Sequence, residues 1–157
     1  MIEIDSQAPD FSLQDQHGKA RSLSDYRGDW VLFYAYPKDD TPGCTKEACM
    51  IRDVWSEFEA AGVTVLGISA DSVASHKKFA EKHKLPFTLL ADPEREVLEK
   101  YGMLKDKSMF GKTFLGIQRM SYLIDPKGII RKVYPKVKPE AHADEVLTDV
   151  ASLTVAN

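Results

Sequence analysis

The sequence predicts an α/β protein built on a central mixed sheet flanked by helices. Two apolar runs, residues 30–36 and 63–69, are continuous rather than alternating, which is typical of strands buried on both faces. Apolar residues at helical spacing lie between them, so we expect the two strands to run parallel through a helical crossover. A later pair of strands around the turn at residues 126–128 is expected to be antiparallel, which makes the sheet mixed.

Length and composition predict one domain, residues 1–157, with a single sizeable core. Hydrophobic residues make up 43% of the chain and charged residues 29%, as in soluble globular proteins. The net charge of -3 gives no general attraction to nucleic acid or to an anionic membrane. The longest apolar run is far too short to span a bilayer. The start of the chain lacks the features of a signal peptide, so we expect a cytoplasmic location, where cysteines are more often reactive than structural.

The start of the chain predicts an N-terminal β-hairpin extension. Residues 2–4 alternate apolar and acidic side chains and could form a short edge strand. Residues 11–13 and 20–23 flank a turn signal at residues 15–18, which is the pattern of a small hairpin. Residues 24–28 predict a capped helical turn that ends at a glycine.

The rest of the chain alternates between the helix and strand periods. Helices are expected after the turn at residues 38–43 as far as Gly62, over residues 73–84 and 94–101, and from Pro139 onward; strands are expected over residues 85–91, 119–125 and 129–137. Residues 105–116 have no clear period and predict an irregular loop. The resulting order, a hairpin followed by β-α-β-α-β-α-β-β-α, is the thioredoxin-like architecture with extra elements.

Both cysteines of the chain, Cys44 and Cys49, lie where an apolar strand turns into a helix. The polar turn at residues 38–43 follows the carboxyl end of that strand, where open α/β sheets place their active sites. A free cysteine has a pKa of about 8.5, so only about 3% of it is thiolate at pH 7. Pro42 and Gly43 followed by helix-forming residues put Cys44 in the first helical turn, where unpaired N–H groups favour an anion.

A nucleophilic Cys44 also needs a cation from elsewhere in the chain. The charges within residues 38–47 do not help, because three acids outweigh two lysines. Arg119, at the start of a late strand, is the best candidate, since its fixed charge could stabilise a thiolate and its donors could orient an oxygen substrate. The Thr41 hydroxyl could reach the same oxygens, and Pro37 could wall the pocket against water.

The spacing of the two cysteines predicts a disulfide that forms during a reaction rather than a permanent structural disulfide. In an intact helix, Cα atoms five residues apart are separated by roughly 8.7 Å. A disulfide needs a Cα separation of about 4.4–6.8 Å. Cys49 can therefore bond to Cys44 only after the first turns of the helix unwind. That behaviour suits a resolving cysteine, which attacks Cys44 after its oxidation to a sulfenic acid.

Each residue also has a plainer interpretation. Both cysteines could be buried, inert thiols, Arg119 a surface strand residue and Thr41 an ordinary turn residue. A zinc site needs two more ligands, and the histidines show no matching short spacing: His17, His76, His83 and His142. Two of these, His76 and His83, lie on a charged helix and are expected to be solvated. The lysines of the irregular loop are expected to form a solvated face: Lys105, Lys107 and Lys112.

Three other functions use the same thiols. A thiol–disulfide oxidoreductase would share the fold but normally uses Cys-x-x-Cys, which is absent. A copper or zinc chaperone would use the thiols as ligands, and metal titration would distinguish it. A redox-regulated binding protein or sensor would oxidise without turnover, so it would stop after one equivalent of peroxide.

The motif Pro37-x-x-x-Thr41-x-x-Cys44, with Cys49 five residues on and a later Arg119, resembles the peroxiredoxins. The run from residue 36 to 49 is similar to their bacterioferritin-comigratory-protein branch, also called peroxiredoxin Q. The resemblance extends over nearly the whole chain. It implies that Cys44 is the peroxidatic residue and Cys49 the resolving residue. It further implies that Thr41 and Arg119 hold the peroxide oxygens and that Pro37 shields the site.

The resemblance also implies the reaction. A thiol-dependent peroxidase of this kind reduces hydrogen peroxide and alkyl hydroperoxides, and a thioredoxin-type dithiol recycles it. No metal, flavin or haem is needed. We expect a monomer, because resolution within one chain needs no partner.

Overall fold

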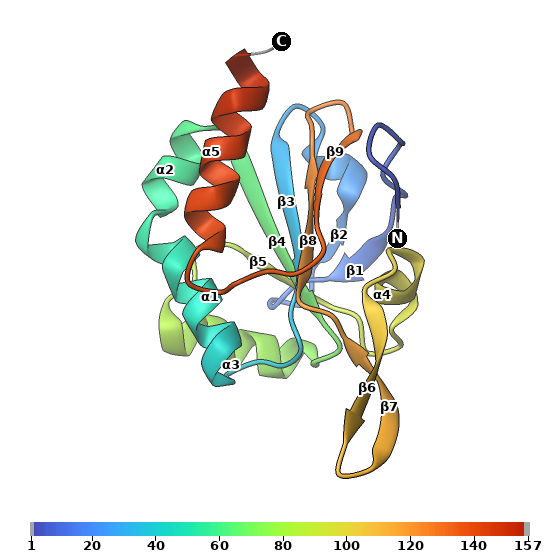
Figure 1. Ribbon diagram of the computed structural model, residues 1–157. Helices are drawn as coiled ribbons and strands as arrows, with labels where there is room; N and C mark the ends of the chain where they lie inside the picture. Colours follow the sequence, from blue (N-terminus) through green and yellow to red (C-terminus); the bar gives the residue numbers. More distant parts are fainter. Residues whose placement is uncertain (1, 156–157) are drawn as a thin grey trace.

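The computed structural model describes residues 2–155 and places a mixed sheet at the centre, with helices on its faces (Figure 1). The strands of the sheet lie in the order β2-β1-β5-β4-β3-β8-β9. These strands are β1 (Ser12–Gln14), β2 (Ala20–Ser22), β3 (Trp30–Ala35), β4 (Val63–Ser69), β5 (Thr88–Ala91), β8 (Met120–Ile124) and β9 (Ile130–Tyr134). The helices are η1 (Leu23–Tyr26), α1 (Pro42–Asp53), α2 (Trp55–Ala60), α3 (Val73–His83), α4 (Glu96–Lys100) and α5 (His142–Val155).

Strand β3 lies near the middle of the sheet, and every residue in it is buried. Trp30, Leu32 and Tyr34 face one core, which α1, α2, α3 and α5 cover. Val31 and Phe33 face a second core, which η1 and α4 help to cover. The prediction of a sheet covered on both faces is therefore confirmed, and the continuous apolar run is its cause.

The strand directions confirm the predicted mixed sheet. Strand β3 pairs in parallel with β4 and antiparallel with β8, and β4 pairs in parallel with β5. The chain leaves β3 at the carboxyl edge of the sheet and enters α1 after a short turn, so the cysteine segment lies at this edge. Among the described residues, no helix is both long and apolar enough to cross a membrane.

The prediction of an irregular loop at residues 105–116 is wrong. Strands β6 (Leu104–Met109) and β7 (Lys112–Ile117) form an antiparallel hairpin that projects from the body of the protein (Figure 1). Phe110 and Gly111 form its turn, with φ angles of 52° and 76°. Two left-handed residues match the strand twist of a two-residue hairpin, but Phe-Gly is not among the usual sequences for such a turn.

Two smaller predictions also need correction. The helix after the cysteines is not continuous to Gly62, because Val54 leaves the helical region with φ -115° and ψ 27°. The chain changes direction there, since α1 packs against α5 and α2 against β4. No edge strand forms at residues 2–4. Asp5 instead has φ 72°, and the chain meets β9 through isolated hydrogen bonds, including one of 2.7 Å from Asp5 N to Ile130 O.

Candidate active site

Cys44 is the third residue of α1, and its side chain is 2% exposed. Thr41 is the N-cap residue, with extended dihedral angles, and Pro42 occupies the first helical position, where its missing N–H costs nothing. The amide of Cys44 therefore belongs to the first turn, which has no acceptors within the helix. This is the predicted placement, and it provides a partial positive charge beside the sulfur.

Arg119 brings a full positive charge to the thiol from the other end of the sequence. Its Nη2 lies 3.2 Å from Cys44 Sγ. Arg119 directly precedes β8, which pairs with β3, so the register of these two strands sets its position. Gly43 permits the approach, because a Cβ there would lie 3.1 Å from Arg119 Nη2. The sequence therefore correctly predicted that Arg119 and Cys44 lie together.

Glu47 shares this arginine and was not predicted as a site residue. It lies one helical turn after Cys44, and its Oε1 accepts a hydrogen bond of 2.8 Å from Arg119 Nη1. Its other oxygen, Oε2, is buried and has no hydrogen-bond partner among the described residues. Burial raises the pKa of Glu47 to about 7, although Arg119 opposes the shift. We call Cys44, Glu47 and Arg119 the thiol cluster.

Cys44 and Glu47 both affect the pKa of Arg119. Burial alone would lower the pKa of its guanidinium, but the contacts with Cys44 and Glu47 outweigh burial and raise that pKa. The arginine therefore stays charged at every physiological pH. The signal for Glu47 in the sequence is its spacing, since residues three apart on a helix share a face.

Thr41 and Pro37 lie in the turn before α1. The Thr41 hydroxyl donates a hydrogen bond of 2.8 Å to the Lys38 carbonyl, so its lone pairs stay available to accept a hydrogen bond from a substrate. Pro37 is exposed. A wall against water at Pro37 therefore remains a prediction, and so does the contact of Thr41 with peroxide oxygens.

Cys49 lies in the same intact helix as Cys44, and both thiols are free. Its side chain is half-buried, on the part of α1 that follows Glu47. The helix is unbroken from Pro42 to Asp53, as the spacing argument requires of the reduced protein. Bond formation with Cys44 therefore still needs local unwinding.

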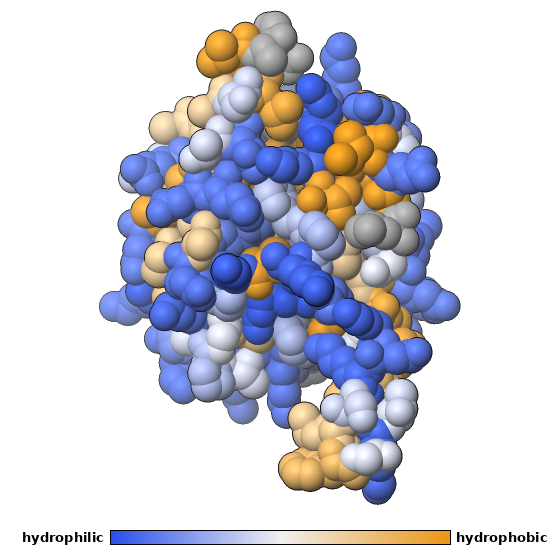
Figure 2. All heavy atoms as spheres, viewed as in Figure 1, coloured by the Kyte–Doolittle hydropathy of each residue, from blue (hydrophilic) through white to orange (hydrophobic). Residues whose placement is uncertain are grey.

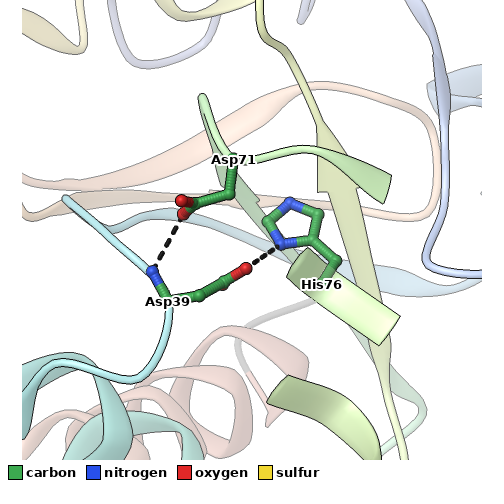
Figure 3. Close-up of side chains that lie close together, drawn as sticks. All are labelled: Asp39, Asp71 and His76. Atoms are coloured by element: carbon green, nitrogen blue, oxygen red, sulfur yellow. Dashed lines mark hydrogen bonds and ion pairs between the residues drawn. The ribbon is translucent and has the colours of Figure 1, made fainter. Parts of the chain in front are cut away.

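A second buried charge cluster ties the turn before α1 to α3 (Figure 3). His76 Nδ1 lies 2.7 Å from Asp39 Oδ2, and the Asp39 backbone N–H donates 2.9 Å to Asp71 Oδ2. We call Asp39, Asp71 and His76 the loop anchor. Neighbouring hydroxyls complete it: Tyr36 and Ser75 donate to Asp39 at 2.6 Å and 2.8 Å, and Ser69 donates to Asp71 at 2.6 Å.

The prediction that His76 is solvated is wrong, because its side chain is 0% exposed. It lies on the buried face of α3 with Phe79, a position that the charged residues around it conceal in the sequence. His76 Nε2 lies 2.9 Å from the Leu90 carbonyl, and Nδ1 faces Asp39. Neither ring nitrogen is free to bind a metal, so the proximity of these three side chains does not favour a cation site.

The adjacent acid, Asp40, also binds α3. Its carboxylate lies 2.7 Å from Lys82 Nζ and 3.0 Å from His83 Nε2. Hydrogen bonds from these two side chains lower the pKa of Asp40. His83 is half-buried rather than freely solvated. Each of the three acids that outweighed the lysines in the sequence thus contacts a basic side chain from a distant segment: Asp39 contacts His76, Asp40 contacts Lys82 and His83, and Glu47 contacts Arg119.

Lys107 approaches the site from the β6–β7 hairpin. Its Nζ donates 2.6 Å to the Ile117 carbonyl, and its stem lies over Gly116, where a Cβ would meet Lys107 Cδ at 2.6 Å. Burial and the charge of Arg119 lower the pKa of Lys107, while Cys44 opposes that shift. The prediction of a fully solvated lysine is wrong at this position. Lys105 and Lys112 are exposed, as predicted.

A third polar cluster has the spacing of a Ser-His-acid triad, but its serine is closed to substrate. Ser121 Oγ lies 2.8 Å from His142 Nε2, and His142 Nδ1 lies 3.0 Å from Glu145 Oε1. Ser121, the second residue of β8, is 0% exposed, so no substrate carbonyl can approach its oxygen. Burial lowers the pKa of His142. The cluster joins α5 to the sheet.

The fold and the thiol cluster define a thiol-dependent oxidoreductase with a thioredoxin-like fold. Residues 4–133 match the AhpC/TSA family. The protein named putative peroxiredoxin bcp of Coxiella burnetii is 53% identical over 146 residues, which cover 93% of this chain and 97% of that protein. Peroxiredoxin Bcp of Escherichia coli K12 is 49% identical over 140 residues, which cover 89% and 90% of the two chains. The chain therefore belongs to the AhpC/TSA family.

Solved structures agree with this membership. A mutant of Xylella fastidiosa PrxQ matches with a TM-score of 0.93 and 32% identity, over 98% of both chains. The bacterioferritin comigratory protein of Xanthomonas campestris, studied for its alkyl peroxide reduction activity, matches with a TM-score of 0.86 and 37% identity, over 90% of both chains. The predicted peroxiredoxin branch, the fold and the enzyme class of a thiol peroxidase are thus confirmed. A sensor without turnover is not favoured.

Proposed function

We propose that Cys44 is the peroxidatic cysteine of this enzyme and that the thiol cluster performs the chemistry. The observation that carries this proposal is the 3.2 Å contact between Arg119 Nη2 and Cys44 Sγ on the first turn of α1. A helix start and a guanidinium together favour the thiolate, which is the nucleophilic form. The site needs no cofactor for this step, because the sulfur itself supplies the two electrons.

The first step is displacement on a hydroperoxide, either hydrogen peroxide or an alkyl hydroperoxide. The Cys44 thiolate attacks the distal oxygen, an S–O bond forms, and the O–O bond breaks. The leaving alkoxide or hydroxide takes a proton and departs as alcohol or water, and Cys44 becomes a sulfenic acid. Arg119 and the first amides of α1 stabilise the charge that develops on the oxygens, with Thr41 as a further hydrogen-bonding partner. Pro37 borders this turn and limits access of water to it.

The second step is resolution by Cys49. The start of α1 unwinds, the Cys49 sulfur attacks the Cys44 sulfenic acid, and water leaves as the disulfide forms. A thioredoxin-type dithiol then reduces the disulfide by exchange and becomes a disulfide itself. All of this takes place within one thioredoxin-like domain, residues 1–157, that acts as a monomer. A cytoplasmic location, where such dithiols are abundant, stays a prediction from the use of cysteine.

The test is mass spectrometry of the reduced protein after one equivalent of hydrogen peroxide. We expect a loss of two hydrogens and a peptide in which Cys44 and Cys49 are linked. A gain of one or two oxygens on Cys44 without the link would keep the peroxidase and remove Cys49 as its resolving residue. An unchanged mass would contradict the proposal.

Replacement of the nucleophile gives the largest expected effect. We predict that Cys44→Ser abolishes peroxide consumption, because a serine hydroxyl is not ionised at neutral pH and cannot reduce the O–O bond. A ferrous-oxidation assay of remaining peroxide measures this directly. Activity retained by Cys44→Ser would show that the reaction takes place elsewhere.

Replacement of the second thiol should separate the two steps. We predict that Cys49→Ser leaves the single-turnover oxidation of Cys44 intact but impairs turnover with thioredoxin as the reductant, because no disulfide can form within the chain. Rapid-quench mass spectrometry follows the first step, and NADPH consumption through thioredoxin reductase follows the second. Unchanged coupled turnover would mean that an external thiol resolves Cys44.

A further inference from the structure

We propose that His76 and Asp39 are positioning residues for the peroxidase reaction. In this proposal, their buried hydrogen-bonded contact fixes the turn that carries Thr41 and Cys44, and it acts through the backbone without touching substrate. The inference rests on the proposed role of Cys44 and adds a second, distant requirement for it.

Hydrogen bonds on every side hold the pair in place. His76 Nδ1 lies 2.7 Å from Asp39 Oδ2, and His76 Nε2 lies 2.9 Å from the Leu90 carbonyl oxygen. Asp39 also accepts a hydrogen bond from the Tyr36 hydroxyl at Oδ1 and one from the Ser75 hydroxyl at Oδ2. Both ring nitrogens and both carboxyl oxygens are therefore engaged, so neither side chain can move without breaking a buried hydrogen bond.

The pair is rigid because both partners are enclosed. His76 is 0% exposed and Asp39 is 8% exposed. His76 lies in the first two turns of α3, whose N-cap Ser72 accepts a hydrogen bond of 3.1 Å from the Ser75 amide. The charged and titratable groups that face the imidazole are Asp39 from the turn, Asp71 before α3 and Tyr36 after β3. Burial and the charge of Asp39 raise the pKa of Tyr36 well above its usual value, so Tyr36 stays a neutral donor.

The connection to the nucleophile is short. Asp39 precedes the N-cap Thr41 by two residues and Cys44 by five. Between them, Asp40 has φ 59°, a left-handed conformation that a non-glycine residue keeps only when its surroundings impose it. Asp40 is held by Lys82 and His83, also on α3. Helix α3 thus holds two successive residues of the turn, which sets where α1 begins and where its first amides point.

Peroxide attack and simple alkylation make different demands on this geometry. Attack on a peroxide needs the sulfur, the donors and the O–O bond aligned, whereas iodoacetamide needs only an accessible thiolate. Misplacement of a reacting group by about 1 Å can cost up to about 100-fold in rate. Replacement of a residue that positions the turn should therefore slow peroxide attack and leave the rate of iodoacetamide alkylation unchanged.

The experiment compares both rates of the reduced protein across a variant set. We expect Asp39→Ala and His76→Ala to slow Cys44 oxidation by hydrogen peroxide by about tenfold or more, with iodoacetamide alkylation changed by less than about twofold. Asp39→Asn, which keeps the shape and can hydrogen-bond a neutral His76, should retain most of the peroxide rate. Lys77→Ala, an exposed neighbour of His76 on α3, is the matched control and should match the parent protein in both rates.

A double variant covers the case in which an unpaired buried polar group prevents folding. Asp39→Ala with His76→Leu removes both polar side chains together, and it should be no slower toward peroxide than either single variant because the two residues act as a unit. Unchanged peroxide rates in the alanine variants would overturn the proposal. A parallel loss of both rates, or a loss in Asp39→Asn as large as in Asp39→Ala, would also overturn it. A parent protein that does not react with peroxide would reject the proposed function itself, before any variant is measured.

Discussion

Two buried charge clusters meet the segment between β3 and α1, and they differ in how completely their polar atoms are paired. In the loop anchor, both oxygens of Asp39 and both nitrogens of His76 have hydrogen-bond partners. In the thiol cluster, Glu47 Oε2 is buried without a partner among the described residues, and one arginine serves both Glu47 and Cys44. Fully paired networks make a structure rigid, whereas incompletely paired groups mark sites that change charge.

This difference assigns separate tasks to the two clusters. In the proposed cycle, oxidation of Cys44 replaces a thiolate by a sulfenic acid, so Arg119 and Glu47 must accommodate two charge states of the sulfur. The loop anchor contains no group that reacts in the proposed cycle, so it can hold the turn while the start of α1 unwinds. The comparison predicts that changes in the thiol cluster alter the reactivity of the sulfur itself, and that changes in the loop anchor alter only its placement.

The strongest test of this division is Arg119→Ala. We expect peroxide attack to slow about 100-fold, because the donor that stabilises both the thiolate and the developing charge is lost. Iodoacetamide alkylation should also slow, in contrast to the loop-anchor variants. Arg119→Lys is the control, since it keeps the charge but not the two-pronged geometry, and it should lose less. Stopped-flow oxidation and quenched alkylation measure the two rates. A normal rate of peroxide attack in Arg119→Ala would show that Arg119 is not the cation that stabilises the Cys44 thiolate.

The second test uses the protonation of Glu47. Its pKa in the folded protein is about 7, raised by burial from an ordinary 4.5. The native state therefore binds this proton more tightly than the unfolded state does. The resulting stabilisation is complete below pH 4.5 and is lost as the pH rises through about 7. A shift of this size corresponds to roughly 3 kcal/mol.

Glu47→Gln, which is neutral at every pH, should lack this loss. We expect the difference in free energy of unfolding between the parent protein and the variant to change by roughly 3 kcal/mol from pH 4.5 to about pH 8, in favour of the variant. Urea unfolding of the reduced proteins across this range measures it. Glu59→Gln is a suitable control, because Glu59 is an exposed glutamate on α2. Parallel pH profiles for the parent protein and Glu47→Gln would contradict the assignment.

The buried strands were predictable from the sequence because burial on both faces leaves a continuous apolar run. The runs at residues 30–36 and 63–69 correspond to β3 and β4, whose residues are almost all buried. The β6–β7 hairpin was not predictable in the same way. It has exposed apolar side chains at and near its tip, including Phe110 at 97% exposure, and so it lacks the alternation of a strand that covers a core (Figure 2).

The candidate site was predictable where its position depends on local chain features. Pro42 and Gly43 indicate a helix start, which places Cys44 in the first turn. Contacts between distant segments were harder to predict. The partner of Asp39 lies 37 residues away on α3, and the charged neighbours of His76 suggested solvent rather than core. A charge count along the chain shows which charges are near in sequence but not which of them are paired in space.

The smallest expected effect concerns Lys107, which lies beside the thiol cluster without belonging to it. The charge of Arg119 helps to lower the pKa of its ammonium group and Cys44 opposes that shift, but its hydrogen bond is to the Ile117 carbonyl. We expect Lys107→Met to slow peroxide attack by less than about threefold, because a partly exposed charge is screened by solvent and Arg119 stays in contact with the sulfur. Lys112→Met, exposed on the adjacent strand, should have no effect. The same stopped-flow assay at low and high salt measures both variants, and the small loss should disappear at high salt. A loss as large as that of Arg119→Ala would place Lys107 within the thiol cluster and make the hairpin part of the site.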